Sequence, residues 1–166
     1  KHKVVGINLS ASQKWPTKNW PIEFIAKVCD RLAEQGVRVM ITGMKKDAEL
    51  ADELARLTKS KPANFVGKTN VLQLAILIKN CRVYLTPDSA PMHIAAAMKV
   101  PFVAFFGPTD SRRHVPPAKD CVILEKKLNC APCYSSRCRI MTHACMRNIT
   151  VDEVLKSINQ FMKVEV

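Results

Sequence analysis

A polar turn, Asp88-Ser89-Ala90-Pro91, separates an apolar segment from an alanine-rich run. The pattern predicts a strand over residues 82–86 and a helix over residues 91–98. The first N–H groups of a helix have no partner within the helix and carry a partial positive charge, so this turn could hold a phosphate group. Ser89 would add a hydroxyl, and the small Ala90 would let an anion approach the backbone. An ordinary helix cap by Asp88 or Ser89 explains the same residues equally well.

A second polar stretch, residues 8–21, also follows a predicted strand and precedes a predicted helix. Small residues plus lysine in such a loop suit a diphosphate, and an ordinary surface loop is the alternative. Neither stretch has the spacing of a P-loop or of the GxGxxG dinucleotide fingerprint. The small residues and lysines of this loop are Ser10, Ala11, Ser12, Lys14 and Lys18.

The elements that position these two turns alternate between strand and helix patterns. Apolar runs such as residues 102–106 indicate strands buried on both faces, which is typical of parallel sheets covered by helices. The sequence therefore predicts an α/β fold with helices on both faces, and ligands bind such sheets beyond the carboxyl ends of the strands. The predicted strands cover residues 4–7, 37–42, 64–66, 82–86, 102–106 and 121–124, and the predicted helices cover residues 21–35, 47–57, 71–79, 91–98 and 151–162.

Length and composition favour one domain, residues 1–166, with 48% apolar residues. No run is long and apolar enough to span a membrane, and the first residues lack a signal-peptide pattern, so a soluble protein is expected. The formal net charge of +12 comes from 26 Lys and Arg against 14 Asp and Glu, and such an excess attracts anions. Because the basic residues are scattered and aromatic residues are few, no nucleic-acid partner is expected. A phosphorylated ligand or an anionic lipid surface fits better.

Several motifs together resemble the C-terminal half of glycosyltransferase family 9, the ADP-heptose:lipopolysaccharide heptosyltransferases. They are WPTKNWP at 15–21, ITG followed by Asp47, DSAPMHIAAA at 88–97, FFGPTD at 105–110, and CAPC at 130–133 with HACM at 143–146. The resemblance implies a GT-B type enzyme of two facing Rossmann-like halves. Residues 1–166 would form the nucleotide-sugar (donor) binding domain, with the N-terminal acceptor domain absent from this sequence.

The resemblance also implies roles for particular residues. Ser89, Ala90 and Pro91 would form the anion-binding turn, with His93 nearby and Asp88 supporting the loop. Lys18 would neutralise the donor phosphates, assisted by Ser10, Ala11 or Ser12, while Asp47 would accept ribose hydroxyls and Thr69 would touch the base. A helix N-cap remains an alternative for Asp47, and a core histidine for His93. Ala90 stands where relatives usually have glycine, and alanine disfavours positive φ.

Transfer of a sugar requires that negative charge developing on the leaving ADP be stabilised. Backbone N–H donors and a lysine can do this without a metal ion or another cofactor. The general base of this family is an Asp of the N-terminal half, so no catalytic residue is assigned here, and this chain is expected to bind the donor without turning it over. The expected acceptor is lipopolysaccharide core, held by the missing domain, and the expected location is cytoplasmic, with peripheral association at the inner membrane left open.

Two other kinds of function remain open from the sequence. One is a different sugar-nucleotide transferase or an epimerase on the same fold, and the other is a non-catalytic nucleotide- or anion-binding module. The cysteines also leave alternatives: Cys130, Cys133 and Cys138, with His143 or Cys145, have a spacing compatible with zinc, with disulfides or with reduced thiols. Cys29, Cys81 and Cys121 fall in helix or strand patterns and are interpreted as small buried apolar residues.

Overall fold

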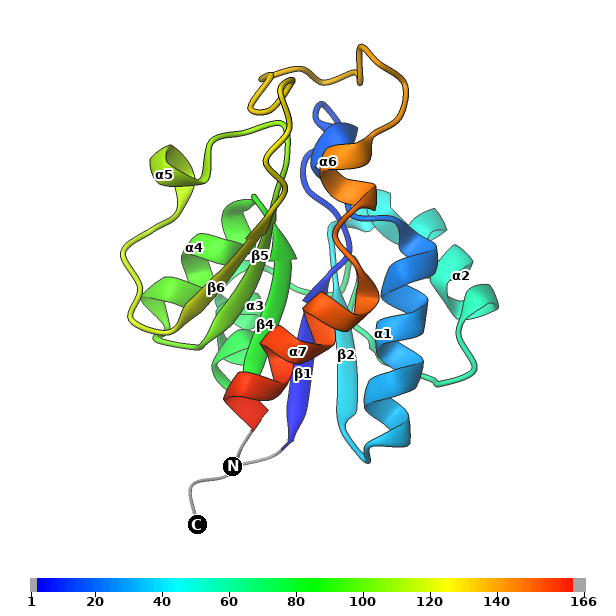
Figure 1. The fold of residues 1–166 in the computed structure, drawn as a ribbon. Coiled ribbons are helices and arrows are strands. Elements are labelled where there is room, and N and C mark those ends of the chain that lie inside the picture. The colour runs from blue at the N-terminus through cyan, green and yellow to red at the C-terminus, as the bar shows by residue number, and fades with distance from the viewer. Residues whose placement is uncertain (1–2, 163–166) are drawn as a thin grey trace.

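A computed structural model describes residues 3–162, and its strands form one parallel sheet (Figure 1). The strand order is β3-β2-β1-β4-β5-β6. The order reverses between β1 and β4, and this reversal is where open α/β sheets leave a crevice for ligands. The strands are β1 (Val4–Asn8), β2 (Arg38–Thr42), β3 (Ala63–Asn64), β4 (Val83–Pro87), β5 (Phe102–Phe106) and β6 (Cys121–Glu125).

Helices cover both faces of the sheet, which confirms the predicted α/β, Rossmann-like fold (Figure 1). The helices α1 (Ile22–Glu34), α2 (Ala48–Leu57) and α7 (Val151–Met162) pack on one face, and α3 (Val71–Lys79) and α4 (Ala90–Ala97) pack on the other. Successive side chains of a strand point to opposite faces of the sheet, so each strand contributes to the hydrophobic core on either face. In β4, Val83 and Leu85 join the first core, whereas Tyr84 joins the second.

The predicted elements are confirmed with small shifts at their ends. The strand expected at residues 64–66 is shorter, because β3 ends at Asn64. The chain still runs beside β2, since the N–H of Phe65 donates to Ile41 O at 2.9 Å. Four short helices were not predicted, because three or four residues show no period in a sequence; they are η1 (Pro16–Lys18), η2 (Lys45–Asp47), α5 (Ser111–His114) and α6 (Ala144–Arg147).

Trp20 anchors the start of α1 to the sheet. Its ring stacks on Phe105 with the ring centroids 4.8 Å apart, and its Nε1–H donates to Ile149 O at 3.1 Å. This packing fixes the carboxyl end of the loop between β1 and α1. None of the helices within residues 3–162 is long and apolar enough to cross a membrane.

Candidate functional site

A cleft of about 790 Å³ opens at the carboxyl edge of the sheet, where the strand order reverses between β1 and β4. Its walls come from the segments that follow β1, β2, β3 and β4. The structure brings all eleven residues predicted for the site into the lining of this one cleft. They are Ser10, Ala11, Ser12, Lys18, Asp47, Thr69, Asp88, Ser89, Ala90, Pro91 and His93.

The turn between β4 and α4 presents the start of a helix to the cleft. Ser89 is extended, with φ −159°, and Ala90 is the first residue of α4. Ala90 is therefore helical, and the cost expected from positive φ does not arise. The Ser89 hydroxyl makes no capping bond but lies 3.0 Å from Thr86 Oγ1 and donates to Pro87 O at 3.1 Å. The interpretation of Ser89 as a helix cap is thus wrong, and no side chain caps the first turn of α4. In that turn Pro91 has no N–H and the Met92 N–H donates to Ser89 O at 3.0 Å, so the Ala90 N–H is the group left without a side-chain cap.

Lys18 reaches the same turn from the other loop. Its Nζ donates to Asp88 Oδ2 at 2.7 Å, and the Thr109 hydroxyl donates to the same oxygen at 2.9 Å. The side chains of Lys18 and Asp88 are 17% and 7% exposed, so this ion pair is largely shielded from solvent. Asp88 therefore orients the ammonium group through Oδ2, and α4 begins without a side-chain capping bond.

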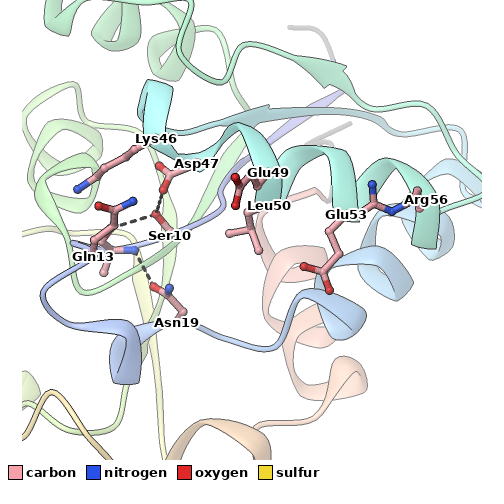
Figure 2. Close-up of a pocket in the computed structure, with 10 residues that line it drawn as sticks. Ser10, Gln13, Asn19, Lys46, Asp47, Glu49, Leu50, Glu53 and Arg56 are labelled. Carbon is pink, nitrogen blue, oxygen red and sulfur yellow. Dashed lines mark hydrogen bonds between the residues drawn. The ribbon is translucent and has the colours of Figure 1, made fainter.

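Asp47 is buried and joins two loops. Its Oδ1 accepts from the Ser10 hydroxyl at 2.8 Å, and its Oδ2 accepts from the Met44 N–H at 2.7 Å. Figure 2 shows the first of these bonds beside an adjoining pocket of about 420 Å³. Asp47 stands at the N-cap position of α2 but makes no capping bond to that helix, so its interpretation as the N-cap of the helix that follows is wrong. Both carboxylate oxygens already hold the protein's own loops together.

His93 and Thr69 lie on the side of the cleft formed by α3 and α4. His93 is exposed on the first turn of α4, so the core-histidine alternative is wrong. Thr69 is half-buried just before α3, whose N-cap is Asn70. The Asn70 side chain accepts from the Gln73 N–H at 2.9 Å, and Gln73 returns a bond to the Asn70 N–H. This reciprocal cap fixes the segment that carries Thr69.

Further cleft residues were missed by sequence reasoning. Asn8 ends β1, and its Nδ2 donates to Ser10 O at 2.7 Å and to Ser89 Oγ at 3.2 Å, so it links the two loops. A polar residue at the end of an apolar strand was the available signal. Lys45 and Lys46 follow β2 at the same edge and add exposed positive charge. The apolar part of the lining comes from Met44, Val71, Leu74 and Ile94, for which the sequence offered no signal beyond hydrophobicity.

The cysteine-rich segment lines a separate cavity of about 280 Å³. Cys130, Cys133, Cys138 and Cys145 all contact it, and the structure describes every one of the seven cysteines as a free thiol. Within residues 3–162, no three His, Cys, Asp or Glu side chains are arranged to hold a metal ion. The choice among zinc, disulfides and reduced thiols for this segment stays as the sequence left it. Cys29 and Cys81 are buried as predicted, whereas Cys121 is only half-buried.

Comparison with known proteins assigns the sequence to a family. Residues 1–143 match the sequence model of glycosyltransferase family 9 (heptosyltransferase). The chain belongs to glycosyltransferase family 9. Lipooligosaccharide heptosyltransferase 2 of Campylobacter jejuni is 29% identical over 165 residues, 97% of this chain and 51% of the relative. Lipooligosaccharide heptosyltransferase 2 of Haemophilus influenzae is 38% identical over 109 residues, 63% of this chain and 31% of the relative.

A solved structure of this family has the same fold. The E. coli ADP-heptose lipopolysaccharide heptosyltransferase II superposes with a TM-score of 0.83 at 26% identity, over 96% of this chain and 46% of the other. This family 9 chain therefore spans about half the length of the C. jejuni relative and of the E. coli structure. The E. coli match also agrees with the predicted GT-B type fold.

Proposed function

We propose that this chain binds the ADP moiety of an ADP-heptose donor, in an enzyme that transfers heptose to the inner core of lipopolysaccharide. One observation carries the proposal. The N-terminus of α4, which no side chain caps, and the Lys18 ammonium group both line one cleft, at the point where the strand order of the sheet reverses. N–H groups at a helix start and a nearby ammonium are donors suited to a diphosphate. The relatives named as heptosyltransferases support the choice of donor.

In this proposal the diphosphate lies against Ser89, Ala90 and Pro91, with His93 beside it and Lys18 across from it. Ser10, Ala11 and Ser12 border the phosphates on the β1 side, while Thr69 and the apolar Met44 and Val71 border the nucleoside. Asp47 contributes mainly by fixing Ser10, since both of its oxygens accept hydrogen bonds from the protein. A ribose hydroxyl could still donate to a remaining lone pair of this carboxylate.

The chemical contribution of these groups is to stabilise the leaving ADP. Negative charge grows on the diphosphate as the bond to the sugar breaks, and preorganised N–H donors with one lysine favour that charge. The proposed site calls for no resident cofactor or metal ion. The acceptor and the general base that deprotonates its hydroxyl are proposed to be held by sequence outside residues 1–166.

The experiment is a calorimetric titration of ADP, GDP and UDP into the chain. ADP binding clearly tighter than GDP and UDP binding is expected from the proposed donor. Tighter binding of GDP or UDP would instead indicate a different sugar-nucleotide enzyme. Flat titrations with all three would contradict the proposal, and measurable heptose transfer by the isolated chain would contradict its dependence on an outside base.

We propose in addition that the protein works in the cytoplasm and associates peripherally with the inner membrane. The net charge of +12 supports this part, because anionic lipid contributes on the order of 1 kcal/mol per nearby Lys or Arg. Co-sedimentation with phosphatidylglycerol vesicles that weakens as salt rises is the expected result. Equal binding to neutral phosphatidylcholine vesicles, or none to either, would contradict it.

A further inference from the structure

The cysteine-rich segment, residues 130–143, is tied to the loop that carries Lys18. We call this segment the strap. The Thr17 hydroxyl donates to Ser135 O in the strap at 2.7 Å, and the His143 Nε2–H donates to Thr17 O at 2.7 Å. Thr17 is buried and lies in η1, next to Lys18. The strap thus holds both the side chain and the backbone of the residue that precedes the lysine.

The strap is also fixed to the sheet side of the cleft. The Tyr134 N–H donates to Pro108 O at 2.7 Å, and Pro108 precedes Thr109, whose hydroxyl donates to Asp88. Contacts therefore run from the strap in two directions, through Thr17 to Lys18 and through Pro108 and Thr109 to Asp88. The two members of the ion pair are held from the same segment.

The backbone of His143 has an unusual conformation. His143 has φ 50°, in the left-handed region that non-glycine residues rarely adopt, and its N–H donates to Cys138 Sγ at 3.3 Å. Tyr134 and Met141 in the strap also have positive φ. Such conformations persist where the surroundings determine them, and they often accompany functional sites. The conformation of His143 aims its ring at Thr17 O.

We propose that His143 and Thr17 are positioning residues that set the location of Lys18 for the donor diphosphate. The inference rests on the proposed function for its ligand. The backbone of η1 supports it, because the Lys18 N–H donates to Trp15 O at 3.0 Å, so a displacement of Thr17 moves the whole turn. Asp88 fixes the Nζ of Lys18, and the strap fixes the backbone of the turn that carries Lys18 through its bonds to Thr17.

The test compares His143→Asn with His143→Gln in the whole chain. Asn tolerates the left-handed conformation but is too short to reach Thr17 O, whereas the Gln amide nitrogen reaches about as far as Nε2. His143→Asn is expected to weaken ADP binding about three- to tenfold, with little change for AMP, and His143→Gln is expected to restore most of the affinity. In a Lys18→Met background the same change should leave ADP binding unaltered.

A second measurement needs no nucleotide. Hydrogen exchange of a peptide covering residues 15–19 should quicken in His143→Asn and in Thr17→Val, because each loses one tie to the strap. His114→Asn is the matched control, since His114 also lies near the strap, 3.4 Å from Tyr134 Oη, but is not bonded to Thr17. Thr17→Val also serves if His143→Asn fails to fold.

Equal losses for ADP and AMP, the same loss without Lys18, or unchanged exchange at residues 15–19 would each overturn the inference. A parent chain that binds no ADP would overturn the proposed function instead. The exchange measurement would then still decide whether the strap holds the Lys18 loop.

Discussion

Lys18 and Asp88, seventy positions apart in the chain, form an ion pair of 2.7 Å between the loop after β1 and the turn after β4. The pair lies at the point where the strand order of the sheet reverses. An ammonium group held in this way needs little reorganisation to meet an anion, because its position is fixed before a ligand arrives. The same ion pair therefore holds the two loops together and positions the ammonium group for the proposed diphosphate.

Replacing the lysine tests that connection directly. Lys18→Met should weaken ADP binding roughly 10- to 100-fold, the usual range for one charge-assisted hydrogen bond. AMP should lose less, since it lacks the second phosphate. Titration calorimetry measures both ligands, with Lys14→Met as the control because Lys14 is exposed in the same loop and outside the cleft lining. An equal loss of ADP affinity in Lys18→Met and Lys14→Met would show that ADP binding depends on net charge and not on the position of Lys18.

Asp47 should matter more for the fold of the site than for direct ligand contact. An amide in its place cannot accept from both Ser10 and Met44, so Asp47→Asn should lower the free energy of unfolding by about 1–3 kcal/mol. Urea denaturation measures this change, and Asp52→Asn, exposed on α2, is the control. Unchanged stability with a large loss of ADP affinity, but not of pyrophosphate affinity, would identify Asp47 as a ribose ligand instead.

Acid should loosen the packing of α1 against the end of α2 through Asp30. Burial acts to raise the pKa of Asp30, but hydrogen bonds from the Thr58 hydroxyl and the Ser60 and Lys59 N–H groups outweigh it and bring the pKa below the ordinary 3.8. A carboxylate with a lowered pKa stabilises the fold fully above its unfolded value. That stabilisation is lost as the pH falls through the folded value.

Urea midpoints at pH 5 and pH 3 test this prediction. From pH 5 to pH 3, the urea midpoint of the parent should fall further than that of Asp30→Asn, whose amide cannot titrate. Glu34→Gln, exposed at the end of the same helix, should behave like the parent. Identical pH slopes for the parent and Asp30→Asn would rule out this carboxylate as the cause.

The seven thiols should differ sharply in reactivity. Burial raises the pKa of Cys29 and of Cys81 to about 12 each, whereas Cys130 is exposed. Because the thiolate is the reactive form, iodoacetamide at pH 8 should label Cys130 first, and Cys29 and Cys81 only after unfolding. Mass spectrometry of peptides over a time course gives the order. Early labelling of Cys29 in the native protein would mean that α1 opens readily.

Much of the fold could be predicted from the sequence because it depends on local patterns. The apolar run Phe102–Phe106 marks a strand buried on both faces, and its partner helices show their own period. The candidate cleft could also be predicted, since polar residues after parallel strands converge at one edge of the sheet. Short helices such as η1 and α6 could not, because a single turn carries no period.

The sequence by itself determined the α/β class, the edge of the sheet that carries the site, and the motifs shared with glycosyltransferase family 9. Only the tertiary structure decided the partners of Asp47, of Lys18 and of His143. The physical reason is the range of each interaction. Helix and strand patterns depend on neighbours a few residues away, whereas His143 meets Thr17 across 126 positions, and such a contact exists only once the chain has folded.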